Sequence, residues 1–183
     1  MTSVRDNELL DVLVSMGAGS EPHNSNEDLL AHLCGTRDLL RSWGAPNSLI
    51  HAGLFHSVYG TEYFTAKTMP APSRAQVLAE LGSRGETLVW LWCFGRRTTL
   101  EPQLERGRIA LIQDRRDDEW IRITEQQYDD LVTLWIADTL EQLERMPERE
   151  IPNVRRLMHY RERALPAACA ALEDVFERID QPN

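Results

Sequence analysis

Cysteine is scarce in this chain of 183 residues. Its three cysteines, Cys34, Cys93 and Cys169, are widely spaced, and no Cys-x-x-Cys pair is present. Neither a disulfide framework nor a thiolate zinc site is therefore expected. Each cysteine lies among apolar residues, so we interpret all three as buried free thiols.

Long apolar runs are also missing. No stretch approaches the roughly 18 consecutive apolar residues that a transmembrane helix needs. The first residues, Met-Thr-Ser-Val-Arg-Asp-Asn-Glu, lack the apolar core of a secretory signal peptide. The composition is 42% apolar, with a mean hydropathy of -0.41, which suits a protein with a sizeable core. We expect a cytoplasmic protein that does not associate with membranes.

Lysine is almost absent, because 19 of the 20 basic residues are arginine, a bias that we attribute to genome composition. The single amine side chain, Lys67, lies 11 residues after His56 and is a candidate for substrate binding, with chance placement as the alternative. The net charge of -9 argues against a nucleic-acid partner or an anionic membrane surface. A local basic patch could still bind a small anionic molecule.

The spacing of apolar residues predicts a mainly α-helical protein. Asn26 and Ser73 are expected N-caps, Thr124 with Gln127 forms an expected capping box, and Gly44 ends a helix. The predicted helices span about 5–18, 27–43, 46–57, 73–81, 85–95, 125–146, 153–163 and 165–179.

One segment has strand character. Two short extended runs, at Ile109-Ala-Leu-Ile and Trp120-Ile-Arg-Ile, flank a charged turn, so a small β-hairpin is predicted within 108–123. Residues 58–72 are predicted to form a loop, and Pro147 and Pro152 are expected to interrupt the chain. No internal repeat or domain boundary is visible, so residues 1–183 are predicted to form one domain.

Two histidines and one aspartate lie on apolar helix faces. A carboxylate on such a face is costly unless it is paired, and a salt bridge to a buried arginine is one explanation for Asp138. For His32 or His56 alone, a hydrogen-bonded core histidine is the simpler interpretation. Together, two imidazoles and a carboxylate suit a divalent ion such as Mn, Fe or Zn. Three protein ligands would leave open positions for water or substrate, as in a catalytic site.

The loop after His56 carries groups for proton transfer. Glu62 is a candidate general base, with a solvated loop carboxylate as the alternative. Tyr59 could orient a substrate or pack on the core, and Ser57 could hold a water. Ser57 and His56 do not form a hydrolase triad, because adjacent helical residues diverge and no nucleophile elbow is present.

Arginine pairs are candidates for anion binding. Arg96 and Arg97 follow an apolar helix, and guanidinium groups suit bidentate recognition of phosphate or carboxylate. A second pair, Arg115 and Arg116, is surrounded by aspartates and is interpreted as a solvated turn. The tryptophans at 90, 92 and 135 are expected in the core rather than in a base-stacking platform.

Three segments resemble the HD superfamily of metal-dependent helical enzymes. They are the run His-Leu-Cys-Gly-Thr beginning at His32, the run Leu54-Phe-His-Ser, and the run Ile136-Ala-Asp-Thr-Leu, the last being similar to alarmone hydrolases. Residues 29–64 more specifically resemble an uncharacterised HD-like family with a Gly-Leu-Phe-His-Ser-x-Tyr-Gly-Thr motif, and a looser similarity extends to about 143. The resemblance implies an HD-like helical bundle over 26–146, with the terminal helices as additions. It also implies a phosphoester or nucleotide substrate.

Ser57 departs from this resemblance. The family has an aspartate there that ligates the metal and bridges two metals in dinuclear members, and a hydroxyl replaces it poorly. His51 cannot easily join His56 on one ion, because it lies about 140° around the helix. A mononuclear His32, His56 and Asp138 site is therefore expected, with hydrolase, lyase, isomerase or oxidative chemistry left open. The alternatives are a non-catalytic ligand- or partner-binding module without metal, and a purely structural domain.

Overall fold

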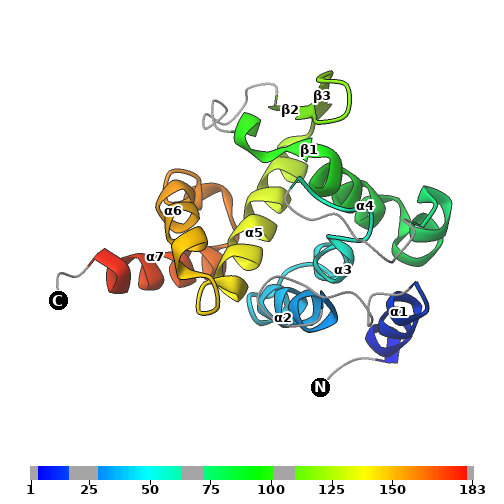
Figure 1. Ribbon diagram of the computed structural model, residues 1–183, viewed down its shortest axis with the longest axis horizontal. Helices are drawn as coiled ribbons and strands as arrows, with labels where there is room; N and C mark the ends of the chain where they lie inside the picture. Colours follow the sequence, from blue (N-terminus) through cyan, green and yellow to red (C-terminus); the bar gives the residue numbers. More distant parts are fainter. Residues whose placement is uncertain (1–3, 17–28, 63–71, 101–109, 181–183) are drawn as a thin grey trace.

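The computed structural model describes residues 4–16, 29–62, 72–100 and 110–180, and within them the protein is mainly α-helical with one small antiparallel sheet (Figure 1). Two short 3-10 helices, η3 and η4, complete the elements. The bounds are α1 Val4–Ser15, α2 Leu29–Ser42, α3 Asn47–Phe55, α4 Arg74–Phe94, β1 Gly95–Arg96, η3 Arg97–Leu100, β2 Ala110–Asp114, β3 Trp120–Ile123, α5 Glu125–Gln142, α6 Pro147–Leu157, η4 Arg161–Arg163 and α7 Pro166–Asp180.

Helix ends follow local sequence chemistry. Thr124 and Gln127 form the predicted capping box at the start of α5, and Ser73 forms a second one with Gln76 at the start of α4. Gly44, just after α2, has a φ of 70°, a conformation that favours glycine. Asn26, the other expected cap, lies outside the described residues.

One pair of helix predictions was confirmed and one proline prediction was wrong. The expected helices 73–81 and 85–95 lie on either side of a break within α4 at Gly82, where φ is 69° and ψ is 172°. A break between α5 and α6 precedes Pro147 as expected, but Pro152 does not interrupt the chain, because α6 begins at Pro147 and continues through Pro152. Proline is tolerated at a first helical position, where its missing N–H would have no intrahelical partner.

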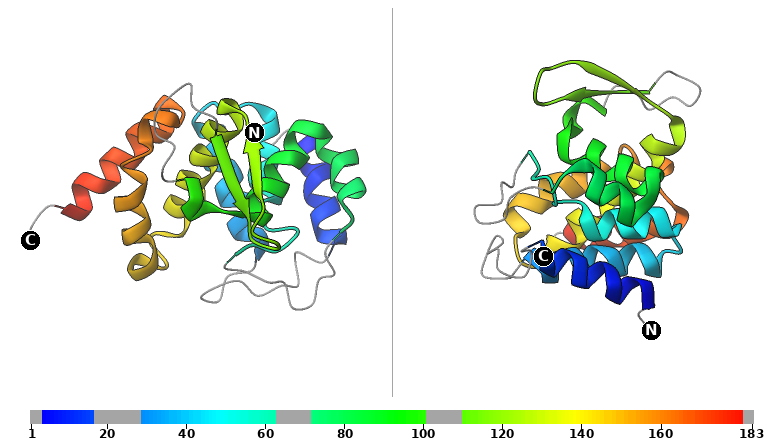
Figure 2. Two further views of the ribbon diagram at one scale, coloured as in Figure 1. Left: turned by 90° about the horizontal axis from the view of Figure 1, so that it is seen from above. Right: turned by 90° about the vertical axis from the view of Figure 1, so that its right-hand side faces the viewer.

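The predicted hairpin is confirmed and gains a third strand. Strands β2 and β3 pair antiparallel from Ala110 opposite Ile123 to Gln113 opposite Trp120, and β1 adds to the other edge of β2. The hairpin projects beyond the helices (Figure 2). At Gly95, where α4 ends and β1 begins, an added Cβ would lie 2.4 Å from the backbone carbonyl oxygen of Leu91, so this position requires glycine.

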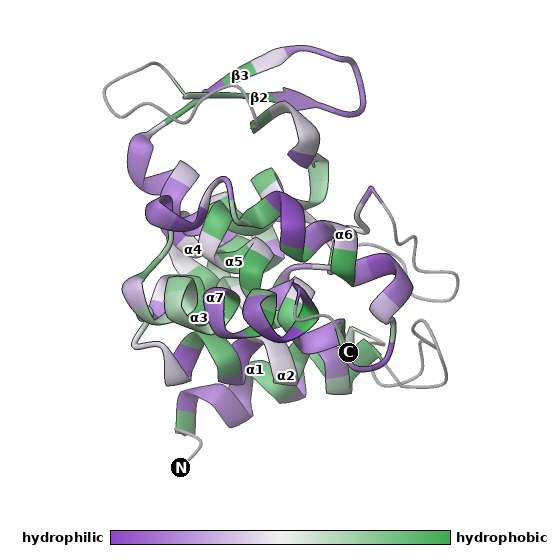
Figure 3. Cartoon of the chain, turned by 90° about the vertical axis from the view of Figure 1, so that its left-hand side faces the viewer, coloured by the Kyte–Doolittle hydropathy of each residue, from purple (hydrophilic) through white to green (hydrophobic). Residues whose placement is uncertain are grey.

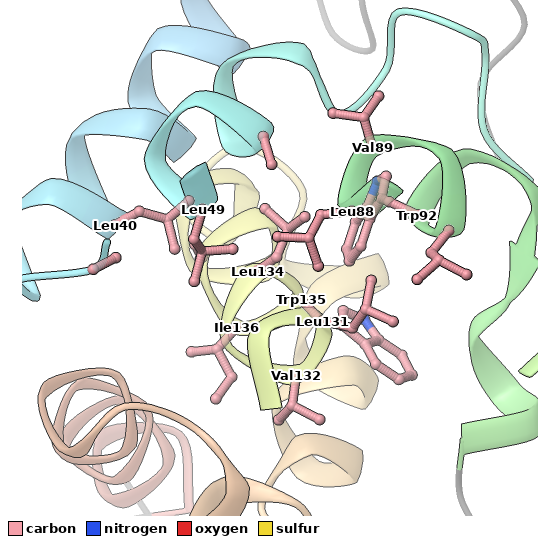
Figure 4. Packing of buried hydrophobic residues seen from close by; sticks show 14 of the residues in the cluster. Leu40, Leu49, Leu88, Val89, Trp92, Leu131, Val132, Leu134, Trp135 and Ile136 are labelled. Atoms are coloured by element: carbon pink, nitrogen blue, oxygen red, sulfur yellow. The ribbon is translucent and has the colours of Figure 1, made fainter. Parts of the chain in front are cut away.

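Helix α5 is the centre of the core. It packs against α2, α3 and α4 on one side and against α6 and α7 on the other. Leu134 is fully buried among leucines of the neighbouring helices, including Leu49 and Leu88 (Figure 4). The hydrophilic faces of the outer helices point away from this core (Figure 3). Replacing such a buried leucine with alanine typically costs about 2 to 5 kcal/mol, so α5 is held firmly in place.

The cysteines are free thiols, but only Cys93 is fully buried, whereas Cys34 and Cys169 are half-buried. The Cys93 thiol donates to the backbone carbonyl of His56 over 3.1 Å. Trp92 and Trp135 are buried in the core as expected, and Trp90 is half-buried. Among the described helices, none has the combined length and apolar character needed to cross a membrane.

Candidate functional site

Three donor atoms from three helical segments meet inside the protein. His32 comes from α2, His56 from the residue after α3, and Asp138 from α5. The two Nε2 atoms are 3.0 Å apart, and Asp138 Oδ1 lies 3.2 Å from His32 Nε2 and 3.3 Å from His56 Nε2. Both imidazoles are 1% exposed. We call these three residues the donor cluster; they are the residues that the sequence predicted as metal ligands.

Close helix packing makes this approach possible. Gly53 on α3 faces α2, and an added Cβ would lie 2.4 Å from Leu40 Cδ1. A larger residue at 53 would therefore have to displace the end of the Leu40 side chain, where the helix that carries His32 packs against the one that ends at His56. The imidazole rings meet edge to face, with their centroids 4.9 Å apart.

The outer nitrogen of each ring is already engaged. His56 Nδ1 lies 2.6 Å from the Gly53 carbonyl oxygen, and His32 Nδ1 contacts the Glu141 carboxylate. Since both partners are acceptors, each Nδ1 donates its proton. In a neutral ring, Nε2 is then an acceptor that faces the centre of the cluster. Metal-ligating histidines in proteins characteristically have this arrangement.

The spacing of the donor cluster fits one ion. Adjacent donor atoms about 2.0 to 2.1 Å from one metal lie about 2.8 to 3.0 Å apart in octahedral geometry and about 3.3 to 3.4 Å apart in tetrahedral geometry. The three distances in the cluster are 3.0, 3.2 and 3.3 Å. Three acceptors at this separation repel one another, and a cation between them relieves that repulsion.

A proton can also serve as this cation. Burial lowers the pKa of His32, but hydrogen bonds to Asp138 and Glu141 outweigh it and raise the pKa to about 9. For Asp138, burial favours the neutral form, yet the hydrogen bonds with His32 and His56 hold its pKa well below the usual range. Without a metal, the cluster would therefore hold a protonated His32 beside an ionised Asp138 at neutral pH.

Glu141 orients His32, although it was not among the site residues predicted from the sequence. Arg145 donates to both Glu141 oxygens over 2.6 Å, which fixes the carboxylate. Gly35 on α2 provides the space, because a Cβ there would lie 2.7 Å from Glu141 Cγ. Burial raises the pKa of Glu141, but His32 and Arg145 outweigh that effect and lower it. The available signal was position, since Glu141 lies three residues after Asp138 on the same helix face.

A pocket of about 180 Å³ adjoins the donor cluster. Arg97 is at its edge, with its guanidinium 4.4 Å from the Trp92 ring centroid and Nη1 3.4 Å from Asp138 Oδ2. Because α6 begins earlier than predicted, its residues contribute to the wall. The lining residues are Arg97, Trp135, Asp138, Arg149, Glu150 and Asn153.

The predicted loop residues lie in different settings. The Tyr59 hydroxyl donates to Glu86 over 3.3 Å, and its ring stacks on Phe94, so it packs with α4 residues. Ser57 is buried just after His56. Glu62 is half-buried, and its Oε2 is buried without a hydrogen-bond partner among the described residues. Of these three, Glu62 has the group best suited to accept a proton.

The predicted anion-binding residues do not all lie at the pocket. Arg97 reaches the pocket, whereas Arg96 pairs with Asp118 in the hairpin turn over 2.8 Å. Lys67 lies outside the described residues. The turn arginines are not simply solvated, because Arg116 binds Asp114 over 2.6 Å and its guanidinium lies 4.2 Å from the Phe94 ring centroid.

Comparison with known proteins gives a partial match to one family model and no activity. Residues 12–97 match the model of a family described as a domain of unknown function, DUF6817. No curated protein shows significant similarity to the chain. The matched segment contains His32, His56 and Arg97 and ends before Asp138. The chain is thus similar over this segment to a family without an assigned function.

Proposed function

We propose that this chain is a metal-dependent enzyme with an HD-like helical core, acting on a small anionic substrate. The observation that carries the proposal is the donor cluster, in which His32 Nε2, His56 Nε2 and Asp138 Oδ1 lie 3.0 to 3.3 Å apart. The three donors come from α2, from the residue after α3 and from α5, which are the segments whose sequences resemble the HD superfamily.

The donor set favours one divalent ion. Two imidazoles and a carboxylate suit Mn, Fe or Zn. Ser57 supplies no carboxylate beside His56, which supports a mononuclear site over a dinuclear one. A bound ion would act as a Lewis acid toward the substrate. Because Asp138 also lines the pocket, the open side of such a site would face the substrate.

Other side chains would bind the substrate and move protons. Arg97, fixed against the Trp92 ring, would bind an anionic group close to Asp138. Glu62 Oε2 is the proposed proton acceptor in the loop after His56. Hydrolysis, elimination and oxidative reactions are all compatible with one Lewis-acid site and these groups.

The second candidate function is a ligand-binding module without metal. The raised pKa of His32, about 9, favours it, because a proton could hold the donor cluster together at neutral pH. In that case the pocket would bind a ligand or partner without chemistry at the cluster.

Metal analysis separates the two functions. Protein prepared without a histidine tag or chelator, and then offered Mn, Fe or Zn, is expected to bind one ion per chain by elemental analysis. His56→Ala should abolish this binding, whereas His159→Ala, which removes an exposed histidine of α6's C-terminal turn, should not. Absence of metal that cannot be restored, or unchanged occupancy in His56→Ala, would contradict the proposed enzyme.

A further inference from the structure

We infer that the pocket beside Asp138 binds a compact oxyanion, a phosphate or carboxylate on a short carbon chain, in preference to a nucleotide. The inference deepens the proposed function, and it rests on that function for the positive charge that a divalent ion at the donor cluster would add to the pocket. It departs from the nucleotide substrates that the sequence resemblance implies. Three properties of the pocket carry it: its volume, its charge and the fixed donors on α6.

The volume limits the size of the ligand. The pocket has a volume of about 180 Å³ and is partly open to solvent. A cavity of about 150 Å³ holds a benzene molecule, so this pocket has room for about seven non-hydrogen atoms. Pockets for drug-sized ligands measure about 300 to 1,000 Å³. A phosphate or carboxylate with two or three carbons fills this volume, whereas the base and sugar of a nucleotide would lie largely outside it and gain few contacts with the lining.

The charge favours an anion. Arg97 and Arg149 contribute two positive charges to the lining, and Asp138 and Glu150 contribute two negative ones, so the side chains sum to zero. A divalent ion bound by Asp138 would leave the occupied pocket with two positive charges. A phosphate ester or a carboxylate would offset this charge in a partly buried site, where electrostatic attraction is screened little.

Arg149 supplies a fixed donor. Its Nη2 donates to Gln142 Oε1 over 2.6 Å and its Nε donates to Glu150 Oε1 over 2.5 Å. Its Nη1 has no hydrogen-bond partner among the described side chains, so two N–H groups remain for a ligand. A guanidinium held in this way loses little conformational freedom on binding an oxyanion.

Glu150 and Trp135 complete the wall. Glu150 is 1% exposed and accepts from both Arg149 and Asn153, so it holds two pocket donors in place. Trp135, also buried, offers an apolar ring to a short carbon chain. The pocket therefore combines a polar end for an oxyanion with one apolar surface of limited extent.

Calorimetric titration with three probes tests this inference. Ethyl phosphate and propionate represent the two kinds of small oxyanion, and AMP carries the same phosphate on a larger body. The metal-loaded protein is expected to bind at least one of the small probes about tenfold or more tightly than AMP. Arg149→Gln should weaken that binding about 10- to 100-fold. Arg84→Gln is the matched control, because Arg84 pairs with a buried Asp130 but does not line the pocket.

A second variant covers the case in which Arg149→Gln does not fold. Asn153→Leu retains the Arg149–Glu150 pair and fills the pocket, so it should abolish binding of the small probe. Binding of AMP as tight as that of the small probes, no binding of either small probe, or unchanged binding in both variants would overturn the inference. Metal content measured on the same samples distinguishes the two ideas: metal-free protein that still binds ethyl phosphate through Arg149 contradicts the proposed enzyme and supports the small-oxyanion pocket.

Discussion

Around α4, buried carboxylates are matched with arginines, whereas at the junction of α2, α3 and α5 a carboxylate faces two imidazoles. Glu86 receives two hydrogen bonds from Arg74, at 2.6 and 2.9 Å, and Asp130 receives one from Arg84 at 3.0 Å. Both arginines are more than half exposed, so their charge is also solvated. Each of these carboxylates is therefore paired with a cation that the protein itself supplies.

The donor cluster is built differently. His32 and His56 donate outward through Nδ1, to Glu141 and to the Gly53 carbonyl, and present Nε2 inward toward Asp138. Arg97 is the nearest analogue of the α4 arginines, but its contact with Asp138 is longer, at 3.4 Å. Acceptors thus face acceptors, an arrangement that a cation completes. The comparison shows how a structural ion pair differs from a site that needs a cation: in the ion pair the protein supplies the positive charge, and in the donor cluster it does not.

The largest expected effect is on metal affinity. Asp138→Ala should reduce affinity about 100- to 1,000-fold, since structural zinc sites gain roughly 10 to 16 kcal/mol from four ligands. Asp130→Ala removes a similarly buried carboxylate of the same helix and should leave affinity nearly unchanged. Competition with a chromophoric chelator measures the metal affinity of both variants. An equal loss of affinity in Asp138→Ala and Asp130→Ala would show that the donor cluster is no more specific for metal than the ion pairs around α4.

Protein from which a chelator has removed the metal should lose stability as the pH rises. The folded-state pKa of His32, about 9, lies above the ordinary value of 6.5. Its stabilising contribution is therefore complete below pH 6.5 and is lost as the pH rises through 9, a change on the order of 2 to 3 kcal/mol. Urea unfolding at pH 6, 7.5 and 9 measures this change. Saturating metal should remove the pH dependence of the unfolding free energy between pH 6 and 9. If the metal-free protein were equally stable at pH 6 and pH 9, His32 would not carry the stabilising proton.

Glu141→Ala should have a smaller effect on metal affinity. Loss of a carboxylate that orients a ligating histidine typically costs about 10- to 100-fold. Glu144→Ala, which removes an exposed carboxylate one turn along the same chain segment, is the control and should change affinity little. The same chelator competition gives both values. If the two variants matched, Glu141 would be a structural residue only.

Gly35→Ala should have the smallest effect, up to about tenfold on metal affinity. The new Cβ would displace Glu141, although alanine itself favours the helix by about 1 kcal/mol. A double-mutant cycle tests the cause: in the Glu141→Ala background, Gly35→Ala should cost no further affinity. If the losses of metal affinity were additive, Gly35 would affect the site other than through Glu141.

The sequence predicted most of the helices because they depend on local pattern, and it predicted the three cluster residues from their ligand chemistry and from the resemblance of their segments to one superfamily. His32 and Asp138 could be placed on apolar helix faces from their spacing alone, and the capping box at Thr124 located α5. The hairpin was visible from its two runs, but β1 was not, because its two residues pair only through a long-range contact with β2.

The rest of the site depends on tertiary contacts. Glu141 reaches His32 only because Gly35 leaves space between α2 and α5. The local sequence does not predict this space. Arg149 and Asn153 were missed because Pro147 and Pro152 were interpreted as interruptions, whereas α6 begins at Pro147 and brings both side chains to the pocket. Tyr59 and Arg96 had plausible sequence positions, but their contacts are with Glu86 and Asp118.

Anomalous diffraction from crystals soaked in Zn or Mn tests the central claim most directly. One peak per chain is expected, about 2.0 to 2.2 Å from His32 Nε2, His56 Nε2 and Asp138 Oδ1. A peak elsewhere, or an empty donor cluster at saturating metal with His32 Nε2 protonated toward Asp138, would contradict the metal centre and favour the metal-free module.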